Sequence, residues 1–345
     1  MTSNEIFQDF QKEHPERTPG SAAAKSLIAQ IVEQTSALGL KATTRQIPVF
    51  HLTISIWVFI TGSLLASVLS LFIPVAGLLL AVILWLLLII EPVGPLLARI
   101  KPSQAENAFL TIPARSKETR KVILIAHLTT DSFAPGPAKP ASRTFLASVA
   151  GLGLFEILIL FAAMAAGQRF ISLLAILPLF GLAVFTILTN ENHQNSSLQN
   201  TSLLLELGSI LWKAGASTTS VVLYFAGANS LNSGVLDLKR LTKNGPEQQY
   251  VIDLIDWPDK RINLVSTDGF LLPRQSDPLL VELFMEVARE KGIPLQTIKL
   301  SELSSTYLLK CKKLKAIAVT NPLETAESEK NLRELLIGII RKLDY

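Results

Sequence analysis

The sequence predicts an α/β fold, with a central, mostly parallel sheet flanked by helices and interrupted by two transmembrane helical hairpins. Apolar runs that end in polar residues alternate with helix-like segments, which is typical of α/β layers. Residues 52–90 contain no Asp, Glu, Lys or Arg, and residues 144–190 contain only Glu156 and Arg169. The 345-residue chain is 49% hydrophobic and only 17% charged, which excludes disordered, collagen-like and coiled-coil chains.

Helices and strands alternate along the polar parts of the chain. Ser21 is a suitable N-cap for a helix that Gly39 ends. Residues 121–127 form a continuous apolar run that ends in His127, which is typical of a buried parallel strand. We expect further strands at 45–50, 108–113 (an edge strand), 220–227, 250–255, 262–266 and 316–320, and helices at 22–38, 201–214, 278–291 and 327–343.

Each of these two charge-poor segments is long enough to cross a bilayer twice. A crossing takes about 20 apolar residues, whereas residues 52–90 number 39 and residues 144–190 number 47. The chain would turn near 74–77 and 167–169. Basic residues flank both segments on one side, which predicts a multi-pass integral membrane protein, with the lipid bilayer as a partner and the soluble domain and both termini in the cytoplasm. These residues are Lys41, Arg45, Arg99, Lys101, Lys139 and Arg143.

The predicted α/β domain is therefore discontinuous. Residues 1–51, 91–143 and 191–345 would build it, and the hairpins at 52–90 and 144–190 would interrupt it. A hairpin returns the chain to the side that it left, so one sheet can be assembled from all three parts.

Charge and cysteine content exclude some partners and sites. The net charge is +4, and the basic residues do not gather with aromatic residues, so we expect no nucleic-acid partner. Cys311 is the only cysteine, so neither an intrachain disulfide nor a cysteine-based zinc site can form. The sequence has no phosphate-binding loop, nucleophile elbow or His-Glu-x-x-His motif.

His127 is the first candidate site residue. Among the histidines, which are His14, His51, His127 and His193, only His127 ends a predicted core strand. The carboxyl ends of parallel strands face the ligand crevice in open α/β sheets. A polar residue that merely closes a strand is the alternative.

The order of segments resembles the zinc-dependent aminopeptidases of metallopeptidase family 28, which include the glutaminyl cyclases. Residues 17–21 (Arg-Thr-Pro-Gly-Ser) look like the family's Gly-Ser segment, and residues 122–127 like its strand that ends in His-x-Asp. Residues 204–207 are similar to the helix after the family's Asp-Asn-x-x-Gly turn. Residues 222–235 are similar to the strand that leads to its Glu-Glu pair. The resemblance implies a zinc-exopeptidase-like fold and, in the family, a two-zinc site with a glutamate as general base.

The resemblance places most of that site on residues that cannot hold zinc. It puts the first histidine ligand on His127, the metal-bridging aspartate on Ser196, the general base on Ala228, the adjacent glutamate on Asn229 and the later aspartate near Ile255. Neutral side chains cannot offset two divalent cations, and Ala228 cannot accept a proton. The chain has no Glu-Glu dipeptide. Asp253 and Asp256 flank Ile255. A shifted alignment would bring in Asp131 or Asp256, and His193 is a further candidate.

Glu156 is a second kind of candidate. It would lie inside the third membrane crossing, where burying a carboxylate costs free energy unless it is protonated or partnered. A carboxylate there is therefore a candidate functional residue. A protonated Glu156 that is hydrogen-bonded to a neighbouring helix is the alternative. Transport through the four helices would depend on this one residue.

These observations predict a membrane-bound pseudopeptidase that serves as a binding or scaffolding module and has no cofactor. Its crevice, lined by His127, Ser196, Ala228 and Asn229, would hold a peptide or a protein partner. The alternative is an active zinc-dependent aminopeptidase-type hydrolase with an atypical metal site, so the sequence leaves enzymatic activity open.

Overall fold

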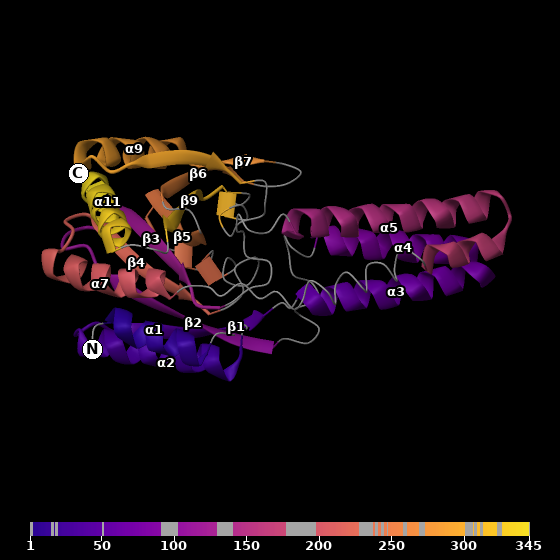
Figure 1. Ribbon diagram of the computed structural model, residues 1–345, viewed down its shortest axis with the longest axis horizontal. Helices are drawn as coiled ribbons and strands as arrows, with labels where there is room; N and C mark the ends of the chain where they lie inside the picture. Colours follow the sequence, from indigo (N-terminus) through magenta and orange to yellow (C-terminus); the bar gives the residue numbers. More distant parts are fainter. Residues whose placement is uncertain are drawn as a thin grey trace. The chain divides into compact units, whose positions relative to one another are not determined.

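The computed structural model contains two compact units, each made of separate stretches of the chain (Figure 1). Unit 1 consists of Met1–Val49, Ser103–Lys139 and Gln194–Tyr345, and unit 2 consists of Phe50–Pro102 and Pro140–His193. The structure describes residues 3–14, 17, 20–49, 52–90, 103–129, 141–176, 198–227 and 237–344, the last range with gaps at 239–240, 243–244, 247, 258–260, 269–272, 301–305, 307–308, 311–312 and 323–325.

A mixed sheet of nine described strands organises unit 1. The strands lie in the order β1-β2-β4-β3-β5-β9-β6-β7, and β8 pairs with β6. The four central strands β4, β3, β5 and β9 are mutually parallel. Their bounds are β1 Ala42–Val49, β2 Ser103–Ile112, β3 Arg120–His127, β4 Thr219–Ala226, β5 Gln248–Trp257, β6 Ile262–Asp268, β7 Arg274–Gln275, β8 Leu295–Lys299 and β9 Lys315–Pro322.

The expectation of a mostly parallel sheet is wrong in part, because the pairs β1–β2, β2–β4, β6–β9 and β6–β7 are antiparallel, whereas β6 and β8 are parallel. The segment 108–113 was also expected at an edge. It instead belongs to β2, which lies between β1 and β4. The alternating apolar residues of β2 indicate which side of the strand faces the core. They do not indicate whether its backbone is hydrogen-bonded to one neighbouring strand or to two.

Helices cover one face of this sheet. They are α1 Ser3–Glu13, α2 Ala22–Ala37, α7 Gln199–Ala214, α9 Pro278–Lys291 and α11 Ala326–Asp344 (Figure 1). Side chains alternate along a strand, so Leu124 and Ile252 join the large helix-side core, whereas Ile123 and Val251 join a second apolar cluster on the opposite face. Leu309 belongs to this second cluster. Polar residues in register with Ile123 and Val251 therefore lie on the face away from the helices.

The last helix is fixed to the sheet by its final residue. The carboxylate of Asp344 accepts the backbone N–H groups of Ser217, Thr218 and Thr219 at 2.6, 2.7 and 2.9 Å. Burial raises the pKa of this carboxyl, but the backbone donors outweigh that effect and hold the pKa below its ordinary value of 3.8. The clamp joins the C-terminal helix to the start of β4.

Unit 2 is a close-packed group of helices, with α3 (Leu52–Phe72), α4 (Pro74–Ile90) and α5 (Ala141–Ala165) side by side (Figure 1). A short 3-10 helix, η2 (Arg169–Ala175), follows α5. Glycines permit the close approach, since a Cβ on Gly77 of α4 would lie 2.6 Å from the carbonyl oxygen of Ala66 on α3. A Cβ on Gly153 of α5 would lie 2.4 Å from the Trp85 ring on α4.

The expected transmembrane hairpins are a wrong prediction. Within the described ranges, no helix combines the length and the apolarity that a bilayer crossing requires. This finding contradicts the expectations of a multi-pass integral membrane protein and of a lipid bilayer partner. It also contradicts the integral-membrane localisation derived from them.

Candidate functional site

His127 and Asp253 meet on the sheet face opposite the five helices α1, α2, α7, α9 and α11. His127 is the last residue of β3, and the register of β3 with β5 pairs Ile125 with Asp253. The Nε2 atom of His127 lies 2.8 Å from Oδ1 of Asp253. The aspartate side chain is fully buried, while the histidine side chain is 19% exposed. The imidazole is therefore oriented by a buried carboxylate and remains accessible from solvent.

This pairing has a chemical consequence for the imidazole. A carboxylate accepts hydrogen bonds, so Asp253 favours the tautomer that carries its proton on Nε2 and its basic lone pair on Nδ1. The same carboxylate stabilises the imidazolium that forms when His127 takes up a proton. A histidine held by a buried aspartate is an arrangement suited to general acid–base chemistry.

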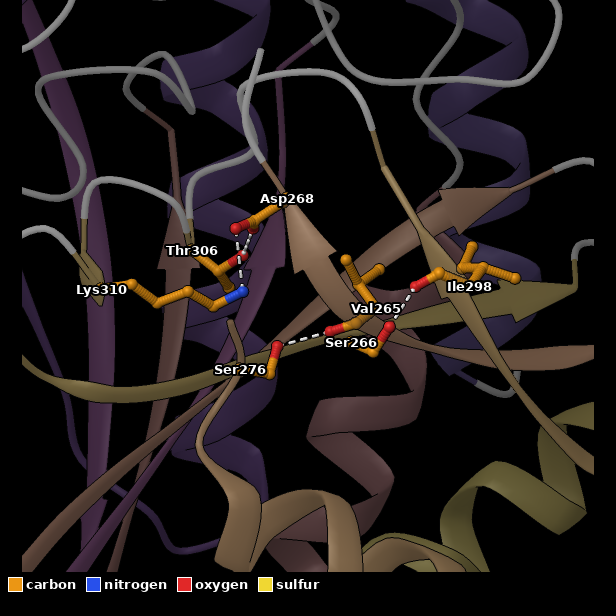
Figure 2. A network of polar contacts seen from close by, with 7 residues as sticks. All are labelled: Val265, Ser266, Asp268, Ser276, Ile298, Thr306 and Lys310. Carbon is orange, nitrogen blue, oxygen red and sulfur yellow. Dashed lines mark hydrogen bonds and ion pairs between the residues drawn. The ribbon is translucent and has the colours of Figure 1, made fainter. Parts of the chain in front are cut away.

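The ion pair between Asp268 and Lys310 is a second charged group in unit 1 (Figure 2). Asp268 ends β6. Its Oδ1 accepts a hydrogen bond from the ammonium of Lys310 at 2.9 Å, and its Oδ2 accepts one from the hydroxyl of Thr306 at 2.6 Å. The Lys310 and Asp268 side chains are 4% and 0% exposed. Burial lowers the pKa of Lys310, whereas Asp268 and, more weakly, Asp253 raise it. Asp253 is therefore within electrostatic reach of Lys310, and the two pairs form one buried charge cluster.

Hydrogen bonds to main-chain carbonyl groups hold β6 in place around this cluster. Figure 2 shows the hydroxyl of Ser276 donating to the carbonyl oxygen of Val265, and that of Ser266 donating to the carbonyl oxygen of Ile298 at 2.9 Å. These bonds tie β6 to the segment before α9 and to β8. The position of Asp268 at the end of β6 is thereby fixed.

Arg17 supports the chain directly after His127. Its side chain is completely buried, its Nε donates to the carbonyl oxygen of Leu128 at 3.0 Å and its Nη1 donates to the carbonyl oxygen of His14 at 2.6 Å. In the sequence, Arg17 is only the start of the segment that resembles the Gly-Ser segment. Its hydrogen bond to Leu128 places Arg17 next to the candidate site.

A separate polar network fixes the end of β4. The backbone N–H of Gly227 donates to Oδ1 of Asn107 at 2.9 Å, and the amide nitrogen of Asn107 donates to the hydroxyl of Tyr224. Tyr224 in turn donates to Asp237, which also pairs with Arg45. Burial and the nearby Asp237 raise the pKa of Tyr224 well above its ordinary value. The network determines where the chain leaves the sheet before Ala228.

The structure brings together only part of the predicted site. His127 lies at a strand end as expected, but Ile255 belongs to a separate apolar cluster with Val265. The residue of β5 that meets His127 is Asp253, two positions earlier. Glu156 lies in unit 2 and not on this sheet. Several predicted positions fall outside the described residues, namely Ser196, Ala228, Asn229, Asp131 and His193.

The described donor set does not fit a two-zinc centre. Catalytic zinc sites usually have three protein ligands, and the described residues contain no group of three His, Cys, Asp or Glu side chains that could hold a metal ion. His127 and Asp253 supply two ligand atoms, and these face each other. Lys310 places a positive charge near the same carboxylate, which disfavours a second cation there.

Comparison with solved structures identifies similar folds. A glutaminyl cyclase from an Acidobacteriales bacterium is 12% identical, with a TM-score of 0.52 over 99% of this chain and 93% of that one. A putative zinc-dependent exopeptidase from Bacteroides vulgatus is 9% identical, with a TM-score of 0.52 over 98% and 94%. A leucine aminopeptidase precursor from Bacteroides thetaiotaomicron is 10% identical, with a TM-score of 0.51 over 98% and 96%. No protein-family model and no curated protein matches the sequence.

These likenesses show a mixed α/β fold of the kind found in glutaminyl cyclases and zinc-dependent exopeptidases. At this level of identity they show the fold alone. The expected multi-pass pseudopeptidase, acting as a binding or scaffolding module, is a wrong prediction because the described residues contain no helix able to span a membrane.

Proposed function

We propose that the protein is an aminopeptidase-type hydrolase with an atypical site, in which the His127–Asp253 pair handles the proton. The single observation that carries this proposal is the 2.8 Å contact between Nε2 of His127, at the end of β3, and the buried carboxylate of Asp253 on β5. The likeness of the fold to exopeptidases supports the substrate class, which is the amino-terminal part of a peptide.

The chemistry assigned to this pair is general-base catalysis. A water molecule attacks the carbonyl carbon of the substrate amide, and His127 accepts the proton that the water loses. Asp253 stabilises the resulting imidazolium, which then donates the proton to the leaving amine. The Lys310–Asp268 ion pair places a buried positive charge within electrostatic reach of Asp253.

The number of zinc ions that the atypical site binds is a separate part of the proposal. Some of the structurally similar proteins are described as zinc-dependent exopeptidases, while the described donors of this chain do not fit two zinc ions. We therefore expect fewer than two zinc ions per chain in elemental analysis of the purified protein. Two tightly bound zinc ions would contradict the atypical site.

The experiment that tests the function compares two buried aspartates. We expect the wild type to release amine from aminoacyl amides, and Asp253→Asn to lower kcat/KM by at least about 100-fold. The matched control is Asp237→Asn, because Asp237 is also buried but pairs with Arg45 and Tyr224. Equal losses in both variants, or no hydrolysis by the folded wild type, would reject the proposal.

A further inference from the structure

Three oxygen atoms in the interior of unit 2 have no hydrogen-bond partner. They are Oε1 of Glu156 on α5 and the hydroxyl oxygens of Ser63 and Ser67 on α3. Glu156 is 1% exposed, and both serines are completely buried. Native interiors leave few polar atoms in this condition, because each has lost its bonds to water without replacement. Three such atoms in one unit therefore call for an explanation.

The three side chains come from neighbouring surfaces of two helices. Ser63 and Ser67 are four residues apart, so they lie one turn apart on the same side of α3. The Ser63 hydroxyl lies close enough to the Glu156 carboxyl to favour its ionised form and so to oppose the effect of burial on its pKa. Near this point α5 approaches α3, since a Cβ on Gly153 would lie 3.3 Å from the Phe59 ring.

The donor set selects the class of ligand. One carboxylate and two hydroxyl groups are hard oxygen donors, which suit alkali and alkaline-earth cations better than softer metals. The carboxylate carries one negative charge, and neither α3 nor α4 contains a charged residue. A monovalent cation therefore balances the charge, whereas a divalent cation would leave an excess positive charge in the interior.

We propose that Glu156, Ser63 and Ser67 form a binding site for one sodium ion inside unit 2. The site is separate from the His127–Asp253 pair, and the proposal goes beyond hydrolysis. Burial raises the pKa of Glu156 to about 7, so near neutral pH the carboxylate needs a counter-charge. A buried water molecule could satisfy the three atoms, but it would supply no charge.

The test is the thermal unfolding of the full-length protein at about pH 8, with choline chloride replaced stepwise by sodium chloride at constant ionic strength. We expect Tm to rise by about 2–4 °C and then to level off as the site saturates. Glu156→Gln should abolish the rise. Ser63→Ala and Ser67→Ala should each raise the half-saturating sodium concentration by about fivefold to tenfold.

Ser70→Ala is the matched control. Ser70 is buried on the same helix, but its hydroxyl donates to the carbonyl oxygen of Ser67 at 2.7 Å, so this variant should keep the wild-type response to sodium. If Glu156→Gln does not fold, 23Na NMR relaxation of the wild type should still show bound sodium that Ser63→Ala weakens. Equal Tm values in choline and sodium, or a sodium response that survives in folded Glu156→Gln, would overturn the proposal. A site that holds only water predicts equal Tm values.

Discussion

Replacing Lys310 by methionine should strongly destabilise unit 1. Methionine keeps much of the length of the lysine side chain but removes the ammonium group that bonds Asp268 at 2.9 Å. Asp268 is fully buried, so its carboxylate would lose its positive partner without gaining access to water. The hydroxyl of Thr306 would remain as a donor to its other oxygen.

The burial of this pair sets the size of the effect. Removing one partner of a buried ion pair costs about 3–5 kcal/mol, and the remaining Thr306 bond places the expected loss near the lower end, at about 3 kcal/mol. Two residues in direct contact should not behave additively. We therefore expect the double variant Lys310→Met/Asp268→Leu to lose at least about 2 kcal/mol less than the sum of the two single variants.

Urea unfolding of the four proteins of this cycle measures both quantities, provided that the slope of the free energy of unfolding with urea stays constant. Lys291→Met is the control, because Lys291 pairs with Glu334 at 3.4 Å on the surface. It should lose less than about 1 kcal/mol. If Lys310→Met loses no more than Lys291→Met, or if the losses of the two single variants simply add, the assignment of a buried charge pair is incorrect.

Three further predictions concern other parts of the molecule. Asp344→Ala should lower the free energy of unfolding by about 1–2 kcal/mol. Because the folded-state pKa of Asp344 lies below 3.8, the wild type should be more stable than the variant above that pH, and this difference should disappear as the pH falls further. An unchanged difference in stability at low pH would contradict the clamp. In choline buffer, stability should fall by about 3 kcal/mol as the pH rises from 4.5 to about 7, because burial raises the pKa of Glu156 over that interval; the same profile in Glu156→Gln would show that another group is responsible. Gly227→Ala should lower Tm, because its Cβ would lie 2.2 Å from the carbonyl oxygen of Glu106, and a Tm equal to that of the wild type would show that the end of β4 adjusts freely.

Local signals in the sequence predicted individual elements well. The helix expected at 278–291 is confirmed as Pro278–Lys291, because each end has its own signal. Asp277 caps the first turn by accepting the N–H of Leu280 at 3.2 Å, and Gly292 adopts the left-handed conformation that ends the helix. The buried strand expected at 121–127 is confirmed as Arg120–His127, whose central five residues are all buried.

Contacts between distant residues could not be predicted in the same way. Asp253 lies in the strand expected at 250–255 and flanks Ile255, but the sequence did not show that its partner is His127. Nothing near Lys310 or Asp268 in the sequence distinguishes them from exposed charged residues. Their burial depends on how β6 and the segment around Lys310 meet in three dimensions.

The membrane prediction failed for a related reason. The scarcity of charged residues in 52–90 and 144–190 indicates that these segments avoid water, but it does not determine how long each helix is or what it packs against. In the structure α3 contributes three buried serines, Ser63, Ser67 and Ser70, to the interior of unit 2. Glu156, which was expected inside a membrane crossing, is likewise buried among protein side chains.

The most direct test of the central claim is the rate at which His127→Gln hydrolyses aminoacyl amides. His14→Gln is the matched control, because the ring of His14 packs on Phe10 outside the His127–Asp253 pair. If His127 is the general base, kcat/KM of His127→Gln falls by at least about 100-fold, while His14→Gln keeps the wild-type rate and both variants keep the wild-type Tm. Wild-type kcat/KM in folded His127→Gln would contradict the account.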